Sequence, residues 1–250
     1  MYWDSLTIKN RAKKVLENHY WEYFLAVVAC SLICGFTARL TLNIDIKGQH
    51  FRTLQDVIDF LLAVWRRYYP SIVSTLAVSG FGRCLWKIFI TNAFETGSCR
   101  YRTIASYGHY DFQNIFYAFS KDRYINIVKT ILIRDIYVFL WSALLIVPGI
   151  IKSYSYFMVP YIMAENPGIT TDRAFSISKS VTTGEKWRIF ILDLSFAGWF
   201  LLGTLCFGLG VLFVLPYHQA AHAELYGALR FKAVRENLVN REEIGAELFD

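Results

Sequence analysis

The chain has 250 residues and a net charge of +6, with 55% hydrophobic, 17% aromatic and only 18% charged residues. This composition is too apolar for an ordinary soluble domain, and the length leaves room for one membrane domain and little else. The basic residues lie at the ends of apolar runs, as the positive-inside rule describes, so we attribute the surplus charge to topology and anionic lipid rather than to nucleic acid.

Residues 1–19 are expected to form a basic amphipathic helix on the cytoplasmic surface. Ile8, Ala12 and Leu16 share one helical face, and four basic residues precede the first apolar run. A signal peptide is the alternative, but no clear cleavage site follows. The first membrane span should therefore remain in place at about residues 20–42.

The second span, at about 71–94, carries Arg83 and Lys87 well inside an apolar run. Charged side chains in a membrane are rare and need partners. The candidates are Asp135 in the third span and Asp193 in the fifth, which lie at a comparable depth in the cytoplasmic half of the bilayer. We predict a buried cluster of these four residues, acting either as a structural ion-pair network or as a polar site for a headgroup, ion or proton.

Two loops flank the second span. Residues 43–69, predicted outside, contain apolar residues at helical spacing that indicate an interfacial helix, with a lid over a bundle cavity as the alternative. The inner loop, 95–123, mixes basic and aromatic residues. This mixture can bind single-stranded nucleic acid, but beside a span it favours the interface of an anionic leaflet.

Pro148-Gly149 predicts the turn after the third span, because proline breaks a helix and glycine allows a reversal. The short fourth span, 150–165, ends before Asn166-Pro167-Gly168. An amphipathic helix is then expected from a Thr171 cap to Gly184, either as an ordinary surface helix or as a gate element.

The apolar run 189–215 is too long for one comfortable span, and glycines interrupt it. We divide it near 206–210 into a hairpin, which keeps the following basic residues inside. His218 and His222, four residues apart, share a face of the sixth span and form a polar pair or two metal ligands. Spacing alone supplies no third ligand, so neither a metal site nor any other cofactor is expected.

Several motifs in the second half of the chain resemble one bacterial membrane family, domain-of-unknown-function family 975. They are a Pro-Gly-Ile turn, Tyr-x-x-Ala-Glu-Asn-Pro, Ala-x-x-x-Ser, Gly-x-Lys-Trp and Leu-Asp-Leu-Ser-Phe-x-Gly-Trp. The matching residues are Pro148, Gly149, Ile150, Tyr161, Ala164, Glu165, Asn166, Pro167, Ala174, Ser178, Gly184, Lys186, Trp187, Asp193, Ser195, Phe196, Gly198 and Trp199, with Asn92, Glu95, Gly97 and Arg100 upstream and Pro216-Tyr217 downstream. The resemblance implies a six-helix integral membrane protein and no particular activity.

Together these patterns predict an all-α fold, a polytopic transmembrane helical bundle of about six spans with amphipathic surface helices. The spans are expected at about 20–42, 71–94, 124–147, 150–165, 187–205 and 208–229, within a membrane domain of 20–230 that precedes a cytoplasmic tail at 231–250. Both termini are expected inside the cell membrane, and the partners are membrane lipids, mainly anionic headgroups of the inner leaflet, with no nucleic acid.

No catalytic motif is evident, so the chain is not expected to be an enzyme. The most favoured function is a non-enzymatic membrane scaffold or lipid-interacting component. The alternative is a small permease or channel-like carrier that uses the charged layer as its polar pathway. A third hypothesis is an intramembrane lipid-modifying enzyme that uses the charged layer with His218 and His222.

Overall fold

The computed structural model describes residues 3–34, 82–205 and 209–244, together with six positions from 55 to 66. Every secondary-structure element within these residues is a helix, so the predicted all-α class is confirmed for the part of the chain that is described. Most of the helix predicted inside the loop 43–69, and residues 71–81 of the span predicted at 71–94, lie outside the described residues.

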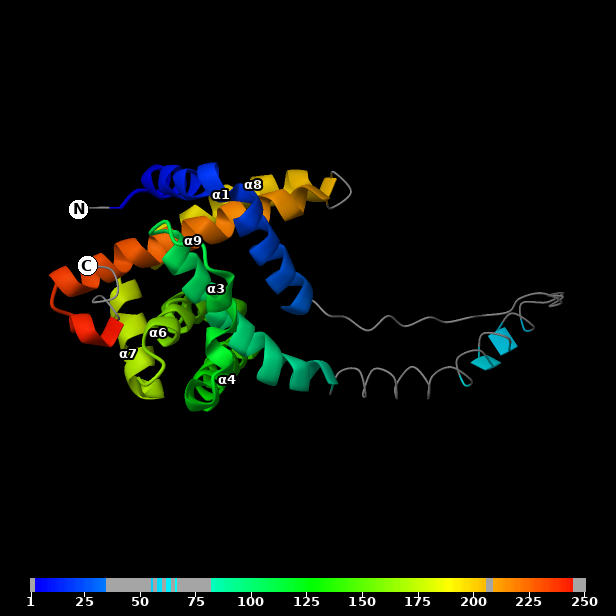
Figure 1. The fold of residues 1–250 in the computed structure, drawn as a ribbon. Coiled ribbons are helices and arrows are strands. Elements are labelled where there is room, and N and C mark those ends of the chain that lie inside the picture. The colour runs from blue at the N-terminus through cyan, green and yellow to red at the C-terminus, as the bar shows by residue number, and fades with distance from the viewer. Residues whose placement is uncertain are drawn as a thin grey trace.

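Helix α1 (Ser5–Cys34) joins the predicted surface helix and the beginning of the first predicted span, with a kink at His19 (φ −133°, ψ 36°). Ile8, Ala12 and Leu16 are buried, as their shared face requires. This part of α1 runs along α9 (Leu209–Arg235), as Figure 1 shows. The amphipathic face therefore packs against protein rather than against a membrane surface.

The helix that carries Lys87 continues well beyond the predicted end of the second span. A helical turn at 82–86 leads into the π-helix η1 (Lys87–Thr91) and then into α3 (Asn92–Ala105). The predicted inner loop, from 95, is thus helical as far as Ala105, and it includes a second helix, η2 (Phe112–Phe119). Gly97 lets these two helices touch, because a Cβ there would lie 1.8 Å from the carbonyl oxygen of Ile115.

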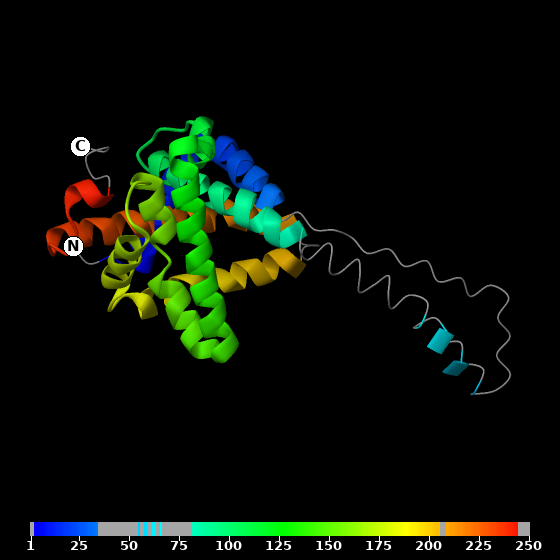
Figure 2. The same cartoon turned by 90° about the horizontal axis from the view of Figure 1, so that it is seen from below.

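Helices α4 (Lys121–Leu144) and α5 (Ile146–Ser155) form a hairpin, visible in Figure 2 as a long green helix with a yellow-green one folding back beside its end. The chain reverses at Leu145, in extended conformation, rather than at the predicted Pro148-Gly149. Pro148 lies in the first turn of α5, where its missing N–H removes no helical hydrogen bond. Gly149 instead allows α5 to pack closely against α4, since a Cβ added at this position would lie 2.4 Å from Ser142 Oγ.

The short fourth span predicted at 150–165 is broken in two. Helix α5 ends at Ser155, and α6 (Val159–Glu165) begins after a break of three residues, 156–158. Ser178 of α7 (Thr171–Thr182) satisfies the backbone at this break, because its hydroxyl accepts from Met158 N (3.2 Å) and donates to the Ser155 carbonyl (2.8 Å). A break in a buried region is tolerated when a neighbouring side chain pairs the freed groups.

The long apolar run forms two helices, α8 (Lys186–Leu205) and α9, which lie side by side in Figure 1. Gly203 and Gly210 bring their backbones together, since a Cβ on Gly203 would lie 2.8 Å from the carbonyl carbon of Gly210. The division of 189–215 near 206–210 therefore agrees with the described helices.

The beginning of the predicted tail docks on the helical domain. After Asn237, which has a positive φ of 53°, the 3₁₀ helix η3 (Arg241–Ile244) buries Ile244. Arg173 Nε of α7 donates to Glu243 Oε1 at 2.8 Å. This hydrogen bond lowers the pKa of Glu243, so the pair is ionised at neutral pH.

Large apolar side chains are exposed at one end of the α4–α5 hairpin and along α8. Leu144 is 74% exposed, Ile146 76% and Leu205 73%. Among the described helices, α8 alone is long and apolar enough to cross a membrane by length and composition, and only 22% of its most apolar stretch is buried. An apolar helix with so little burial is untypical of a soluble protein core.

Gly97→Ala should lower the free energy of unfolding by about 2–3 kcal/mol, because the new methyl group collides with backbone and the two helices must separate. The matched control is Gly227→Ala in α9, where a Cβ meets no atom within 4 Å. The higher helix propensity of alanine should raise the free energy of unfolding of this variant by about 0.5–1 kcal/mol. Thermal and urea unfolding of the purified chain in detergent measure both. Equal stability of the two variants would show that α3 and η2 do not touch at Gly97.

Candidate functional site

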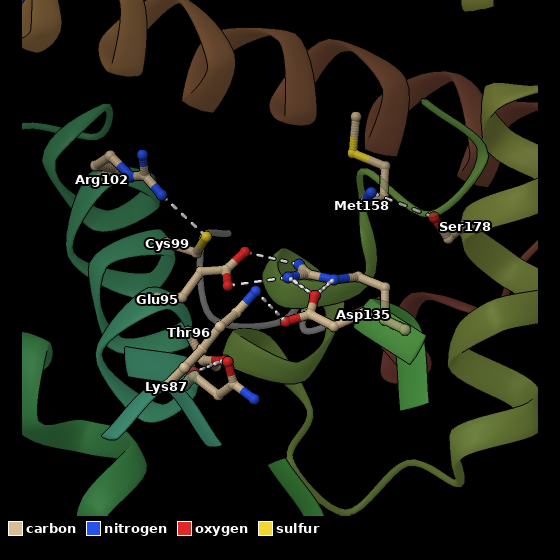
Figure 3. A network of polar contacts seen from close by, with 10 residues as sticks. Lys87, Glu95, Thr96, Cys99, Arg102, Asp135, Met158 and Ser178 are labelled. Atoms are coloured by element: carbon tan, nitrogen blue, oxygen red, sulfur yellow. Dashed lines mark hydrogen bonds and ion pairs between the residues drawn. The ribbon is translucent and has the colours of Figure 1, made fainter. Parts of the chain in front are cut away.

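Four charged residues on η1, α3 and α4 form a cluster whose centre is the guanidinium group of Arg134. Its Nη1 and Nη2 donate to Glu95 Oε1 (2.7 Å) and Oε2 (3.0 Å), and its Nε and Nη2 also donate to Asp135 Oδ1 (3.0 and 2.7 Å). Lys87 Nζ lies 2.9 Å from Asp135 Oδ2, and Figure 3 shows Lys87, Glu95 and Asp135 converging on one point. We call Lys87, Glu95, Arg134 and Asp135 the ion cluster.

The members of the ion cluster differ in burial. The Arg134 side chain is 14% exposed and that of Asp135 20%, whereas that of Lys87 is 59% exposed. A guanidinium group withdrawn from water needs its fixed N–H donors paired, and two carboxylates meet that need here. Arg134 is thus the centre of the cluster, and Lys87 is its accessible cation.

The ion cluster borders a cavity of about 720 Å³. Further polar lining residues include Arg102, Gln219 and His222, and the aromatic ones are Phe139, Tyr156, Phe157 and Tyr161. The two cations and two carboxylates of the cluster cancel, so Arg102 leaves the lining with one excess positive charge. The cavity therefore offers cationic groups and aromatic surface to the same ligand.

Arg102 is fixed at the wall of this cavity by its own helix. Its Nε donates to the Ser98 carbonyl (3.1 Å) and its Nη2 to Cys99 Sγ (3.0 Å), the contact drawn in Figure 3. Burial raises the pKa of the Cys99 thiol, which therefore stays protonated and is a poor nucleophile. Cys99 positions Arg102 and is not suited to covalent chemistry.

The π-helix places Lys87 at the cavity. η1 begins at Lys87 and interrupts an otherwise α-helical segment between 82 and 105. A π-helical turn inserts an extra residue and rotates the side chains on either side of it, and such turns occur frequently at functional sites. Here Lys87 is the first residue of the turn and Glu95 follows it, and both line the cavity.

A second polar group lies between α5, α8 and α9. Asp193 Oδ1 of α8 is 2.6 Å from His222 Nε2 and 3.4 Å from His218 Nε2 of α9. The Tyr154 hydroxyl of α5 donates to the other carboxylate oxygen, Asp193 Oδ2, at 2.9 Å. The close approach of α8 and α9 brings the carboxylate to both imidazoles, and His222 also lines the cavity.

The structure divides the predicted four-residue cluster. Lys87 and Asp135 pair as expected, whereas Asp193 pairs with His218 and His222 instead. Arg83 is exposed and pairs with neither carboxylate. The histidine pair was expected without a third partner, and helical spacing could not reveal one, because it does not tell which helices are neighbours.

Sequence reasoning missed Glu95 and Arg134 as members of the site. Glu95 was assigned to a loop, since the apolar run ends at Phe94 while the helix does not. Arg134 adjoins Asp135 in the sequence but was not included in the predicted cluster. Glu95 did carry a signal, the Asn-x-x-Glu-x-Gly motif, in which Gly97 also proved to have a packing role.

A third polar group explains another motif. Glu165 Oε1, at the end of α6, accepts from Arg230 Nη1 at 2.6 Å, and its Oε2 accepts from the Tyr226 hydroxyl. Arg230 also donates to the Tyr107 hydroxyl. Glu165, Tyr226 and Arg230 are buried and paired, so the Tyr-x-x-Ala-Glu-Asn-Pro motif joins α6 to α9 rather than forming a binding site.

The described fold and its polar clusters define an all-helical protein with a charged cavity between helices. Residues 143–233 match the profile of the family described as protein of unknown function (DUF975), which confirms the resemblance predicted from the motifs over this region. The match includes Asp193, His218 and His222, while the ion cluster precedes it. Neither a curated protein nor a solved structure matches the chain.

Glu95→Gln should lower the free energy of unfolding by about 2–3 kcal/mol, because the mostly buried Arg134 then loses a charged bidentate partner. Lys87→Gln should cost less than about 1 kcal/mol, since the Lys87 side chain is exposed to solvent. Chemical unfolding of the purified variants measures both. Equal losses would contradict the assignment of Arg134 as the centre and Lys87 as the accessible edge.

Proposed function

We propose that the chain is an integral membrane protein of about six spans that binds an anionic lipid headgroup in the cavity at the ion cluster, without catalysing a reaction. Both termini lie on the cytoplasmic side in this proposal, as the basic ends of the apolar runs favour. The function is that of a lipid-interacting membrane component.

The exposed apolar surface supports the membrane placement. Leu144, Ile146 and Leu205 present most of their area outward, and they lie near the ends of helices that the sequence predicts to be spans. Exposing such faces to water would be costly, at about 25 cal/mol for each Å² of apolar surface. Lipid acyl chains remove that cost, so a bilayer is the natural surrounding for these helices.

One observation carries the choice of a lipid as ligand. Phe139 lines the cavity and is also 70% exposed on the apolar face of α4. The cavity therefore opens beside an apolar surface, where acyl chains would lie, while Lys87 and Arg102 supply cations for a phosphate at its polar wall. An amphiphile with an anionic headgroup fits both parts of this lining.

A small permease is the second candidate, because the ion cluster borders a cavity large enough for a small polar solute. A carrier requires a pathway that opens in turn to two aqueous sides. The opening at Phe139 instead faces an apolar surface, which favours entry of a ligand from the bilayer. We therefore rank lipid binding above transport.

Lipid binding is tested with the full chain in a mild detergent, using native mass spectrometry with phosphatidylglycerol and phosphatidylcholine as probes. We expect saturable binding of phosphatidylglycerol, weakened about fivefold by Lys87→Gln because one cation near the phosphate contributes about 1 kcal/mol. Lys14→Gln, an exposed lysine on α1, should leave binding unchanged. Equal binding of both lipids, or no effect of Lys87→Gln, would refute headgroup recognition at this cavity.

The topology is tested with reporter fusions in a bacterial host. Alkaline phosphatase fused after residue 250 should be inactive, because both termini are proposed to be cytoplasmic, and phosphatase inserted within 43–69 should be active. Fluorescence of a green fluorescent protein fused at the C-terminus provides the complementary signal. An active C-terminal phosphatase would place the tail outside and contradict the six-span arrangement.

A further inference from the structure

We propose that Asp193, His218 and His222 form a binding site for a divalent transition-metal ion, with zinc as the best fit. The proposal rests on these three side chains and does not depend on lipid binding. We call them the metal triad.

The ligand atoms of the metal triad already lie close together, all within 4.8 Å of one another. Tetrahedral ligands about 2.1 Å from zinc are about 3.4 Å apart. The distance between Asp193 Oδ1 and His218 Nε2 is 3.4 Å, and that between Asp193 Oδ1 and His222 Nε2 is 2.6 Å. Of these two contacts only the second has to lengthen, by less than about 1 Å, for a zinc ion to replace the hydrogen bond.

The surroundings hold the two imidazoles in this position. His218 and His222 are one helical turn apart, and their ring centroids are 4.1 Å apart. Phe196 and Phe200 pack edge-on against His218, and Phe157 does so against His222. Ligands whose rings are fixed by packing lose little conformational freedom when a metal binds.

Tyr154 supplies the outer contact that metal carboxylates commonly have. Its hydroxyl donates to Asp193 Oδ2 at 2.9 Å, which leaves Oδ1 directed at the two imidazoles. Outer partners of this kind orient a ligand, and their loss typically weakens metal binding about 10–100-fold. Tyr154 comes from α5, so the site unites three helices.

The donor set selects the class of metal. Two imidazole nitrogens and one carboxylate oxygen suit zinc and similar first-row ions, whereas calcium and magnesium prefer oxygen ligands alone. Three protein ligands also leave a coordination position for water or another ligand. His222 lines the cavity, so this site borders the space next to the ion cluster.

The geometry is also that of a purely structural hydrogen-bonded cluster, and metal binding separates the two. The experiment uses the full chain, purified without a histidine tag, stripped with chelator and titrated with zinc by calorimetry. We expect one zinc per chain, an affinity at least about 100-fold lower in His218→Ala and in His222→Ala, and about 10-fold lower in Tyr154→Phe. His109→Ala removes an exposed histidine elsewhere and should change nothing.

Two further measurements keep the test decisive if a variant fails to fold. Cobalt added to the unmodified chain should give the visible absorption of a low-symmetry site, and zinc should raise its unfolding temperature. Absence of both signals, or zinc binding that His218→Ala leaves unchanged, would overturn the proposal and leave a hydrogen-bonded cluster. Lys87→Gln should retain full zinc binding, so a failure of the lipid proposal is distinguishable from a failure of this one.

Discussion

The need to pair the guanidinium group of Arg134 is the constraint on which this arrangement of helices depends. Arg134 is largely buried, and its donors reach Glu95 on α3 and Asp135 on its own helix. Asp135 in turn holds Lys87 at the π-helical turn. Because removing charges from water is costly unless they are paired, the three segments that carry these residues must stay together. The charged groups of these three segments converge on one side, and there they line the cavity.

The distribution of polar and apolar groups follows from the same constraint. Charged and hydrogen-bonding groups are collected between helices, in the ion cluster, in the metal triad and around Glu165. Large apolar residues such as Leu144 and Leu205 face outward. Exposed apolar faces are unfavourable in water and favourable in a bilayer, where polar groups must find their partners inside the protein. Two of the Gly-mediated contacts, at Gly149 and Gly203, let neighbouring helices approach as closely as membrane helices often do.

The sequence was a good guide to individual helices and a poor guide to their neighbours. Periodicity and glycines placed α7 and the division between α8 and α9 within a few residues. Charge and depth predicted a cluster of Arg83, Lys87, Asp135 and Asp193, and of these residues the structure pairs Lys87 with Asp135. The partner of Asp193 was not, because spacing along one helix does not show which helix lies opposite. Glu95 was missed for another reason, since hydropathy marks where an apolar run ends and α3 continues beyond that point.

The most direct test of this account is thiol labelling of the chain in intact membranes. In a cysteine-free background, a single cysteine at position 87 should react with a small water-soluble maleimide, because Lys87 is the accessible edge of the ion cluster. Single cysteines in place of Leu144 and Leu201 should be protected in membranes and should react only after denaturation, since these exposed apolar side chains would face lipid. Rapid labelling at 144 and 201 in intact membranes would place these faces in water and contradict the account.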